Sequence, residues 1–550
     1  MNSDPKQPKE PKIDCVVHIS REYGSLAGAG GIKDVTEGLC KAAAAMGIDT
    51  HIFLPYYRVI DKKNLHLKKS QEFDVEMNYS AEKRTESVTI YSSLIKPKLT
   101  VHLIKAQRYQ YLAEGKSLIK RQGIYQYTKE EAKALGRPEL EGRGYIDFFA
   151  MNVLLVKATL HGLGKMQIRP DIVHCHDGHT ALLPLIAQAS EEIFVPYLCY
   201  VPSVITIHNA GRGYHQEVSD LEFAAAICGV SRDVIKGSLL NGFFDPLLAG
   251  GLFGSAINTV SENYARELQQ TGQDSISGWL GHKLAGYGIK LLGVTNGIDP
   301  ETSNPENSEQ LGLAAGFSIL KGNLAGKEVC KKSTLQELER REVPENIVLK
   351  GAINYQKDIP LLTFIGRLGQ QKGFDILADA VELLFNEDEH VQILGLGDGD
   401  PSIIDRFCKL EKKFKKRVCM AKGYSHLLAN KIYAAGDFFV IPSRFEPCGL
   451  TDFFAQLMGN VPIVHRVGGL VKTLDGRFGF SYLGGAEELL QTLRRALKVY
   501  REPDKKTLSE IQINAVENIY ENFTWEKVLE KKYLPIYRDV ITRSDPSLPY

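Results

Sequence analysis

Two segments in the second half of the chain carry side chains suited to binding an anionic group. The first, Gly366-Arg-Leu-Gly-Gln-Gln-Lys-Gly373, follows a short apolar run and places Arg367 and Lys372 five residues apart among glycines. Two fixed cations beside backbone that lacks side chains fit a diphosphate, on which negative charge accumulates when it departs in a group transfer. The spacing therefore predicts a diphosphate-binding loop.

The second segment, Arg444-Phe-Glu-Pro-Cys-Gly-Leu-Thr451, also follows an apolar run and leads into a predicted helix. It combines the carboxylate of Glu446 with the unpaired backbone N–H groups of a helix start, which attract anions. Taken together with the Arg367 and Lys372 loop, it predicts one site that contains an acid and two cations.

The first half of the chain adds three candidates. Residues 28–34, Gly-Ala-Gly-Gly-Ile-Lys-Asp, enter a long helix and suit either an approaching phosphate or a tight turn that requires glycine. Residues 174–179, His-Cys-His-Asp-Gly-His, suggest zinc, but no distant Cys/His pair completes a tetrahedral set, so we predict no metal. His208 ends a predicted strand, where a neutral imidazole can hydrogen-bond a sugar hydroxyl.

The hydrophobic pattern indicates the frame that positions these residues. Short β-branched or apolar runs at 15–19 and 51–54 flank a segment whose apolar residues recur at spacings of three and four. After an elaboration at 56–145, to which we assign no chemistry, strands and helices alternate again, most clearly from residue 360 onward. This pattern predicts an α/β protein with doubly wound parallel sheets, whose ligands bind at the carboxyl ends of the strands.

A polar segment with several prolines, 299–357, separates the two sets of strands. We therefore predict two Rossmann-like domains that face a central cleft. The expected divisions are a disordered lead at 1–12, an N-terminal domain at 13–294, a C-terminal domain at 295–522, and a last helix at 523–550 that crosses back to the N-terminal domain.

Composition excludes several classes of protein. The chain has 550 residues, with 67 Lys and Arg against 66 Asp and Glu, so its charge gives no reason to expect binding to nucleic acid or an anionic membrane. Its apolar runs are too short to span a bilayer, and we see no signal peptide. The nine scattered cysteines indicate a reducing cytoplasm.

Two nucleotide-binding motifs are incomplete. Residues 395–400, Gly-Leu-Gly-Asp-Gly-Asp, lack the last glycine of G-x-G-x-x-G, which disfavours a dinucleotide oxidoreductase. Asp398 and Asp400 imitate a D-x-D metal motif, but their position deep in the second domain predicts a turn. No P-loop motif occurs.

In their order along the chain, the motifs resemble those of the bacterial glycogen synthases and plant starch synthases, which are retaining glycosyltransferases with the GT-B fold. The likeness extends from Cys15 to about Tyr537. Its main motifs are Gly30-Gly-Ile-Lys-Asp-Val35, His176-Asp-Gly-His-Thr-Ala181, Thr206-Ile-His-Asn209, Asn296-Gly-Ile-Asp299, Gly366-Arg-Leu368 with Gln371-Lys-Gly373, and Pro442-Ser-Arg-Phe-Glu-Pro-Cys-Gly-Leu-Thr451.

The resemblance implies roles for individual residues. Glu446 would steady positive charge at the anomeric carbon of the donor glucose, and Asp177 would lie close to the reaction centre. The implied catalytic residues are Glu446, His208, Asp177 and Asp34. The implied donor-binding residues are Arg367, Lys372, Gly30, Gly31, Asn296, Cys448, Gly449, Leu450 and Thr451.

The chain departs from the family in its first loop. The family usually begins this loop with a lysine, where this chain has Gly28, and Lys33 follows five residues later. We treat Lys33 as a candidate substitute cation, and we expect Gly28 to adopt a positive φ that a lysine would tolerate poorly.

The resemblance implies an enzyme that transfers glucose from ADP-glucose or UDP-glucose to the non-reducing end of an α-1,4-glucan, with retention of configuration and without metal or cofactor. Two alternatives remain open. Gly28 motivates a glucan-binding paralogue with weak catalysis, and the GT-B architecture is shared by glucan phosphorylases, whose pyridoxal lysine motif is not evident here. The motifs carry no information on oligomeric state.

Overall fold

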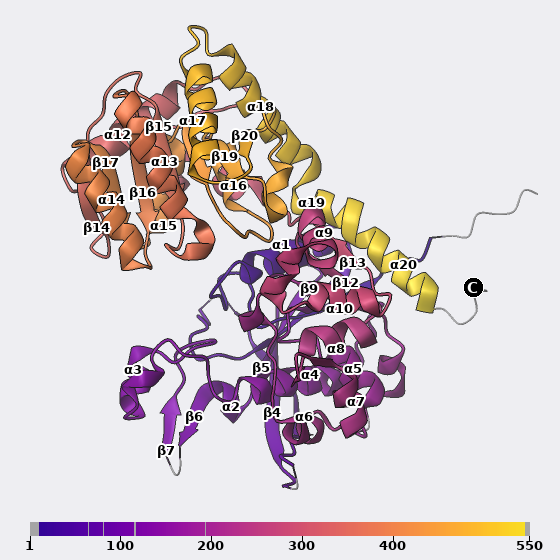
Figure 1. The fold of residues 1–550 in the computed structure, drawn as a ribbon. Coiled ribbons are helices and arrows are strands. Elements are labelled where there is room, and N and C mark those ends of the chain that lie inside the picture. The colour runs from indigo at the N-terminus through magenta and orange to yellow at the C-terminus, as the bar shows by residue number, and fades with distance from the viewer. Residues whose placement is uncertain (1–9, 64, 81, 115–116, 193, 545–550) are drawn as a thin grey trace, which may run out of the picture. The chain divides into compact units, whose positions relative to one another are not determined.

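The computed structural model describes residues 10–63, 65–80, 82–114, 117–192 and 194–544 (Figure 1). The chain divides into two compact units: residues 1–297 with 525–550, and residues 298–524. The chain thus leaves the first unit after Gly297 and re-enters it at Trp525. Most of the predicted disordered lead at 1–12 lies outside the described residues.

The first unit contains a sheet in the order β13-β12-β9-β8-β1-β2-β5-β4-β3. Its strands are parallel except for the β5-β4-β3 meander. The central strands β1, β8 and β9 are buried on both faces, which explains their continuous apolar runs. The strands are β1 (Cys15–Ile19), β2 (Asp49–Pro55), β3 (Lys68–Glu76), β4 (Thr85–Lys96), β5 (Leu99–Lys105), β8 (Ile172–His176), β9 (Ser203–Ile207), β12 (Ala256–Thr259) and β13 (Leu291–Gly293).

Helices from both ends of the chain cover one face of this sheet. Residues of α1 and of the C-terminal α19 and α20 share a hydrophobic cluster with Val16, Ile172 and Val204 of the central strands (Figure 1). The helices of the unit are α1 (Ile32–Ala45), α2 (Gln107–Gln110), α3 (Lys129–Ala134), α4 (Phe148–Lys165), α5 (Leu183–Ala189), α6 (Leu221–Cys228), α7 (Arg232–Gly237), α8 (Pro246–Phe253), α9 (Glu262–Gln270), α10 (Leu280–Gly286), α19 (Trp525–Val528) and α20 (Leu534–Ser544).

Trp525 fixes the start of this C-terminal segment. A Cβ atom on Gly38 of α1 would lie 2.0 Å from Nε1 of Trp525, and one on Gly297 would lie 2.7 Å from its Cδ2. A side chain at position 38 or 297 would therefore overlap the indole, so both positions require glycine.

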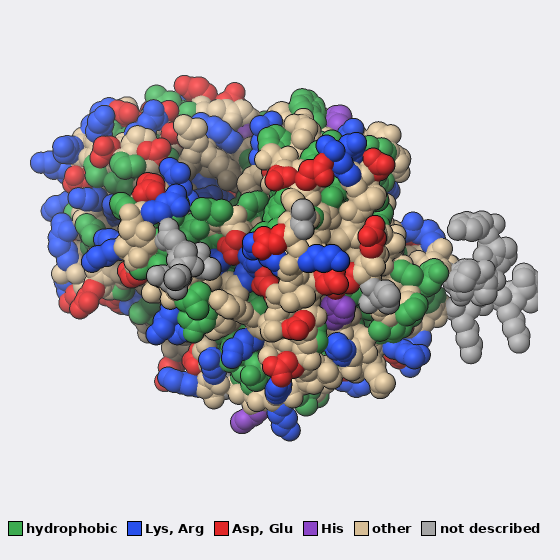
Figure 2. Space-filling view, turned by 90° about the horizontal axis from the view of Figure 1, so that it is seen from below, with side chains coloured by type: hydrophobic (Ala, Val, Ile, Leu, Met, Phe, Trp, Pro, Cys, Tyr) green, Lys and Arg blue, Asp and Glu red, His purple; other side chains and the backbone are tan. Residues whose placement is uncertain are grey.

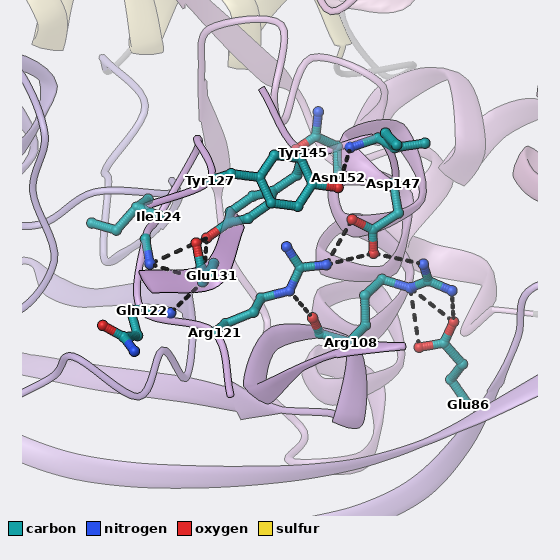
Figure 3. Close-up of polar contacts among 12 residues, drawn as sticks. Glu86, Arg108, Arg121, Gln122, Ile124, Tyr127, Glu131, Tyr145, Asp147 and Asn152 are labelled. Carbon is teal, nitrogen blue, oxygen red and sulfur yellow. Dashed lines mark hydrogen bonds and ion pairs between the residues drawn. The ribbon is translucent and has the colours of Figure 1, made fainter. Parts of the chain in front are cut away.

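The elaboration at 56–145 is held to the rest of the first unit by a half-buried ionic network (Figure 3). Arg108 pairs with both Glu86 and Asp147, and Arg121 contacts Asp147 at 2.6 Å. Glu131 completes a capping box at α3 and accepts a hydrogen bond of 2.9 Å from Tyr145. These contacts tie β4, the short hairpin of β6 (Tyr111–Glu114) and β7 (Ser117–Lys120), and α3 to the N-terminus of α4.

The second unit contains a sheet in the order β14-β17-β16-β15-β18-β19-β20. All neighbours are parallel except β14 and β17. From β15 the chain builds β16 and β17 on one side, then returns to build β18 on the other, so strand order reverses between β15 and β18. The strands are β14 (Val348–Ile353), β15 (Leu361–Ile365), β16 (Gln392–Gly397), β17 (Arg417–Lys422), β18 (Phe438–Ile441), β19 (Val461–His465) and β20 (Phe480–Tyr482).

Helices follow most of these strands, which makes the sheet doubly wound. They are α11 (Ser308–Leu311), α12 (Ala325–Glu339), α13 (Phe374–Glu387), α14 (Pro401–Lys413), α15 (His426–Ala435), α16 (Thr451–Leu457), α17 (Ala486–Tyr500) and α18 (Lys506–Asn522). The predicted fold class is confirmed.

The surface agrees with the balanced composition. Acidic and basic side chains are both scattered over the face in Figure 2. In the described part of the chain, no helix is long and apolar enough to cross a membrane.

Candidate active site

The second unit places two predicted loops at the point where strand order reverses. One loop follows β15 and carries Arg367 and Lys372; the other follows β18 and carries Glu446. The reversal leaves a crevice at the carboxyl ends of the two strands, which is where doubly wound sheets bind ligands. The topology thus brings the two loops to one edge of the sheet.

Backbone and side-chain hydrogen bonds join the two loops. The N–H group of Arg444 donates to the carbonyl of Gln371 at 2.8 Å, and Nε2 of Gln371 donates to the carbonyl of Phe445 at 3.0 Å. Gly373 has a φ of +66°, and a Cβ there would lie 2.0 Å from the carbonyl oxygen of Pro442. Only glycine permits this approach.

The predicted acid and one predicted cation form an ion pair across these loops. Nζ of Lys372 lies 2.6 Å from Oε2 of Glu446, whose side chain is 12% exposed. The hydroxyl of Ser443 donates to the same oxygen at 2.9 Å. Arg367 is exposed, and no partner for its guanidinium occurs among the described residues. The site therefore offers one cation engaged with the acid and a second open to a ligand.

Lys472, which the sequence analysis missed, orients the start of α16. Its Nζ donates to the carbonyls of Cys448 at 2.8 Å and Gly449 at 2.5 Å, and it pairs with Asp452 at 2.9 Å. In a trans peptide the C=O and N–H point in opposite directions. The N–H groups of Gly449 and Leu450 consequently point away from Lys472, and the described chain shows no acceptor for them.

Asp398 and Asp400 lie in the short connection between β16 and α14. Leu368 exchanges backbone hydrogen bonds with both residues, which ties this turn to the loop that carries Arg367. Asp400 accepts from the N–H of Ser402 at 2.8 Å and caps α14. Asp398 accepts from the N–H of Gly399. Both carboxylates thus serve local structure.

In the first unit, the glycine loop lies over a buried carboxylate that the sequence analysis missed. Oε2 of Glu22 accepts from the N–H groups of Ala29 at 2.8 Å and Gly30 at 2.9 Å, and Tyr125 donates to Oε1 at 2.8 Å. The N–H of Gly30 is therefore already engaged. The groups of this loop that remain to bind an anion are the backbone N–H groups of Gly31 and of the first turn of α1, because α1 begins without a side-chain cap.

Lys33 occupies the space beside Gly28. A Cβ on Gly28 would lie 2.2 Å from Cδ of Lys33, so the stem of Lys33 passes where a side chain at 28 would start. Nζ of Lys33 lies 2.5 Å from the carboxylate of Asp34, and both side chains remain partly exposed. The expectation of a positive φ at Gly28 is wrong: it is absent from the described residues that have one. A side chain at position 28 would require Lys33 to move.

Four histidines meet on the same face of β1, β8 and β9. The register of parallel pairing places His18 beside His174, and His176 beside Thr206, two residues before His208. Nδ1 of His18 lies 3.2 Å from Nε2 of His176, and Nδ1 of His176 lies 3.0 Å from Nε2 of His208. Burial lowers the pKa of each of these imidazoles, which keeps them neutral near pH 7.

His18, His174 and His176 bring ligand atoms within 4.8 Å of one another, as a metal site would. However, the hydroxyl of Thr206 donates to Asn258 at 2.8 Å, so it accepts from Nε2–H of His174 at 2.7 Å. Nδ1 of His174 then accepts from the hydroxyl of Tyr537 at 2.7 Å. Because both nitrogens are engaged, His174 offers no lone pair to an ion.

Asp177 supports the backbone of His208. It has a φ of +58°, and its Oδ1 accepts from the N–H of His208 at 2.6 Å. Burial raises the pKa of Asp177 to about 7. Asn296 is buried, and its Oδ1 has no partner among the described residues. The structure thus joins Asp177 to His208 and Lys372 to Glu446, whereas Asp34 pairs with its neighbour Lys33.

Two doubly wound units, each with polar loops at the carboxyl ends of its strands, and a carboxylate paired with a lysine at a switch point are typical of a glycosyltransferase of the GT-B architecture. Comparisons with known proteins agree. A starch synthase catalytic domain profile matches residues 15–283, and a glycosyl transferases group 1 profile matches 359–498. The catalytic domain of starch synthase IV from Arabidopsis thaliana, bound to ADP and acarbose, has a TM-score of 0.74 at 24% identity, covering 97% of this chain and 99% of that one.

Curated relatives identify the family. Glycogen synthase 2 of Geobacter metallireducens is 30% identical over 88% of this chain and 92% of its own length. Glycogen synthase of Aeromonas hydrophila is 28% identical over 96% and 98%, respectively. The chain belongs to the glycogen synthase family.

Proposed function

We propose that the protein transfers glucose from ADP-glucose or UDP-glucose to the non-reducing end of an α-1,4-glucan with retention of configuration. The observation that carries this proposal is the Lys372–Glu446 pair at the switch point of the second unit, with an exposed Arg367 on the same loop as Lys372. Two cations there fit the diphosphate of a sugar nucleotide. The ADP in the related starch synthase structure supports a nucleoside diphosphate as the leaving group.

In this mechanism the bond between the anomeric carbon and the diphosphate breaks first. Arg367 and Lys372 neutralise the charge on the departing diphosphate, and the outward-pointing N–H groups of Gly449 and Leu450 add two further donors. The carboxylate of Glu446 faces the positive charge that develops on the sugar. It is held ready by Ser443, which donates to it whether or not Lys372 turns toward the phosphate.

The acceptor hydroxyl then attacks from the face that the diphosphate leaves. Its proton passes to a phosphate oxygen of the departing nucleotide, so atoms and charge balance without a protein nucleophile. The protein orients the sugar and stabilises separated charge. We propose that no metal or organic cofactor takes part.

The decisive experiment supplies purified protein with ADP-glucose or UDP-glucose in the presence and absence of glycogen. The proposal expects nucleoside diphosphate release that depends on glycogen and on Arg367, with glucose incorporated into the polymer. Phosphate-dependent release of glucose 1-phosphate, together with a pyridoxal absorbance band, would indicate a phosphorylase instead. Glycogen binding without turnover of either donor would indicate the weakly catalytic paralogue.

A further inference from the structure

The histidines of the first unit form a chain of hydrogen bonds that runs from the interior to His208. Its inner end is His18, which is fully buried on β1. Its middle member is His176, which uses both ring nitrogens. Its outer end is His208, which is partly exposed and whose Nδ1 has no partner in the part of the chain that the structure describes.

The direction of the protons in this chain is restricted. A neutral imidazole has one N–H and one lone pair, so His176 must donate through one nitrogen and accept through the other. Only two arrangements satisfy both bonds. In the first, each histidine carries its proton on Nδ1, so that His18 donates to His176 and His176 donates to His208. In the second, each carries its proton on Nε2, so that His208 donates to His176 and His176 donates to His18.

The inner end distinguishes the two arrangements. Nε2 of His18 is buried and has no hydrogen-bond partner among the described residues. If the protons sat on Nε2, a buried N–H would be left without an acceptor, which native structures rarely tolerate. If the protons sit on Nδ1, Nε2 of His18 keeps an unused lone pair, which costs less free energy than a buried N–H group without an acceptor. The first arrangement is therefore favoured.

We propose that His18 and His176 are positioning residues that hold His208 in its Nδ1–H form, so that the site presents a hydrogen-bond donor to a hydroxyl oxygen of the sugar. This inference rests on the proposed function for its ligand, a glucosyl group, but not for its geometry. His174 does not disturb the chain, because Thr206 and Tyr537 engage its two nitrogens.

The first test needs no turnover. Long-range ¹H–¹⁵N correlation spectra of the full chain, labelled with ¹⁵N-histidine in a deuterated background, distinguish the two neutral tautomers, and single His variants assign the signals. We expect His18, His176 and His208 to carry the proton on Nδ1, with His174 as an internal control that carries it on Nε2. An Nε2–H signal for His176 would overturn the proposal.

The second test uses two substitutions at His18. In His18→Asn the amide nitrogen stands near the position of Nδ1 and can still donate to His176, whereas His18→Leu removes the donor. We expect His18→Leu to lower kcat about tenfold with little change in the KM for glycogen, and His18→Asn to stay within about threefold of the parent. Thermal midpoints show whether both variants fold.

The outcomes separate this inference from the proposed function. Equal kcat values for the parent and His18→Leu would overturn the positioning role. A parent protein that turns over neither sugar nucleotide would refute the proposed function, while the tautomers in the spectra would still confirm or overturn the geometry.

Discussion

Lys33 is expected to supply the cation that the first loop lacks at Gly28. In the structure its stem lies over Gly28 and its amine pairs with Asp34. That pair is partly exposed, so it is worth at most about 1 kcal/mol. A charge-assisted hydrogen bond to a phosphate or sugar is worth about 1.5 to 3 kcal/mol. Turning from Asp34 to the substrate is therefore favourable.

Lys33→Ala should lower kcat/KM for the sugar nucleotide about tenfold to about a hundredfold. Gly28→Lys alone should also impair the enzyme, because its Cβ would meet Cδ of Lys33 at 2.2 Å and displace the side chain that supplies the cation. The double variant Gly28→Lys/Lys33→Ala removes this contact and restores a lysine at the start of the loop, so it should recover part of the lost activity. Steady-state kinetics of the parent and the three variants test this.

Two results would refute the reasoning. If Lys33→Ala is silent, Lys33 has not taken over the role. If Gly28→Lys raises turnover, the loop accepts a side chain at position 28 and has lost its cation without replacement. Lys41→Ala serves as the matched control, since it removes a partly exposed lysine of the same helix, which pairs with Glu37.

The remaining predictions concern the second unit and the pH dependence of stability. Lys372→Ala should cost about 2 to 4 kcal/mol of transition-state stabilisation in kcat/KM, with near-normal turnover as the contradicting result. Glu446→Gln should lower kcat more than KM, because the carboxylate acts on charge that develops in the transition state; a glucosyl adduct trapped on Glu446 would contradict this mechanism. EDTA should leave the rate unchanged, and a loss restored by Mg²⁺ or Mn²⁺ would assign a metal to the site. Between pH 4 and 7 the folded protein binds more protons at Asp177 than the unfolded chain does, because its pKa rises from 3.8 to about 7, so stability falls as pH rises through this range. Asp177→Asn removes this dependence. The thermal midpoint of the variant minus that of the parent should therefore increase from pH 5 to pH 8, and a difference that stays constant over this range would contradict the prediction.

The fold was predictable where strands are buried on both faces. β15 and β18 are short, buried and almost entirely apolar runs, and the loops that follow them begin with Gly366 and Pro442, which mark their carboxyl ends. β14 was missed inside the polar segment because it is an edge strand whose residues alternate between exposed and half-buried up to the buried Ile353. Such a strand has little hydrophobic signal of its own, and pairing with β17 decides its conformation.

The candidate site was predictable where a motif lies within one loop, as for Lys372 and Glu446. Residues whose role depends on approach between distant segments were missed. His18 meets His176 because β1 pairs with β8, at a separation of 158 residues. Glu22 accepts hydrogen bonds from the glycine loop only because the folded chain turns back over it. Lys472 donates to backbone carbonyl groups, which every residue has and which a sequence therefore does not distinguish.

The contact of Trp525 with Gly38 and Gly297 gives the first unit an intrinsic optical probe. The chain has two tryptophans; Trp525 is 6% exposed, whereas Trp279 is 47% exposed. The buried indole should fluoresce at shorter wavelength than the exposed one, so in Trp279→Phe the emission comes from Trp525 alone. A red shift in that variant would report release of the C-terminal helices from α1. Because a side chain at position 38 would displace the indole, Gly38→Ala supplies the spectrum of a displaced Trp525 for comparison.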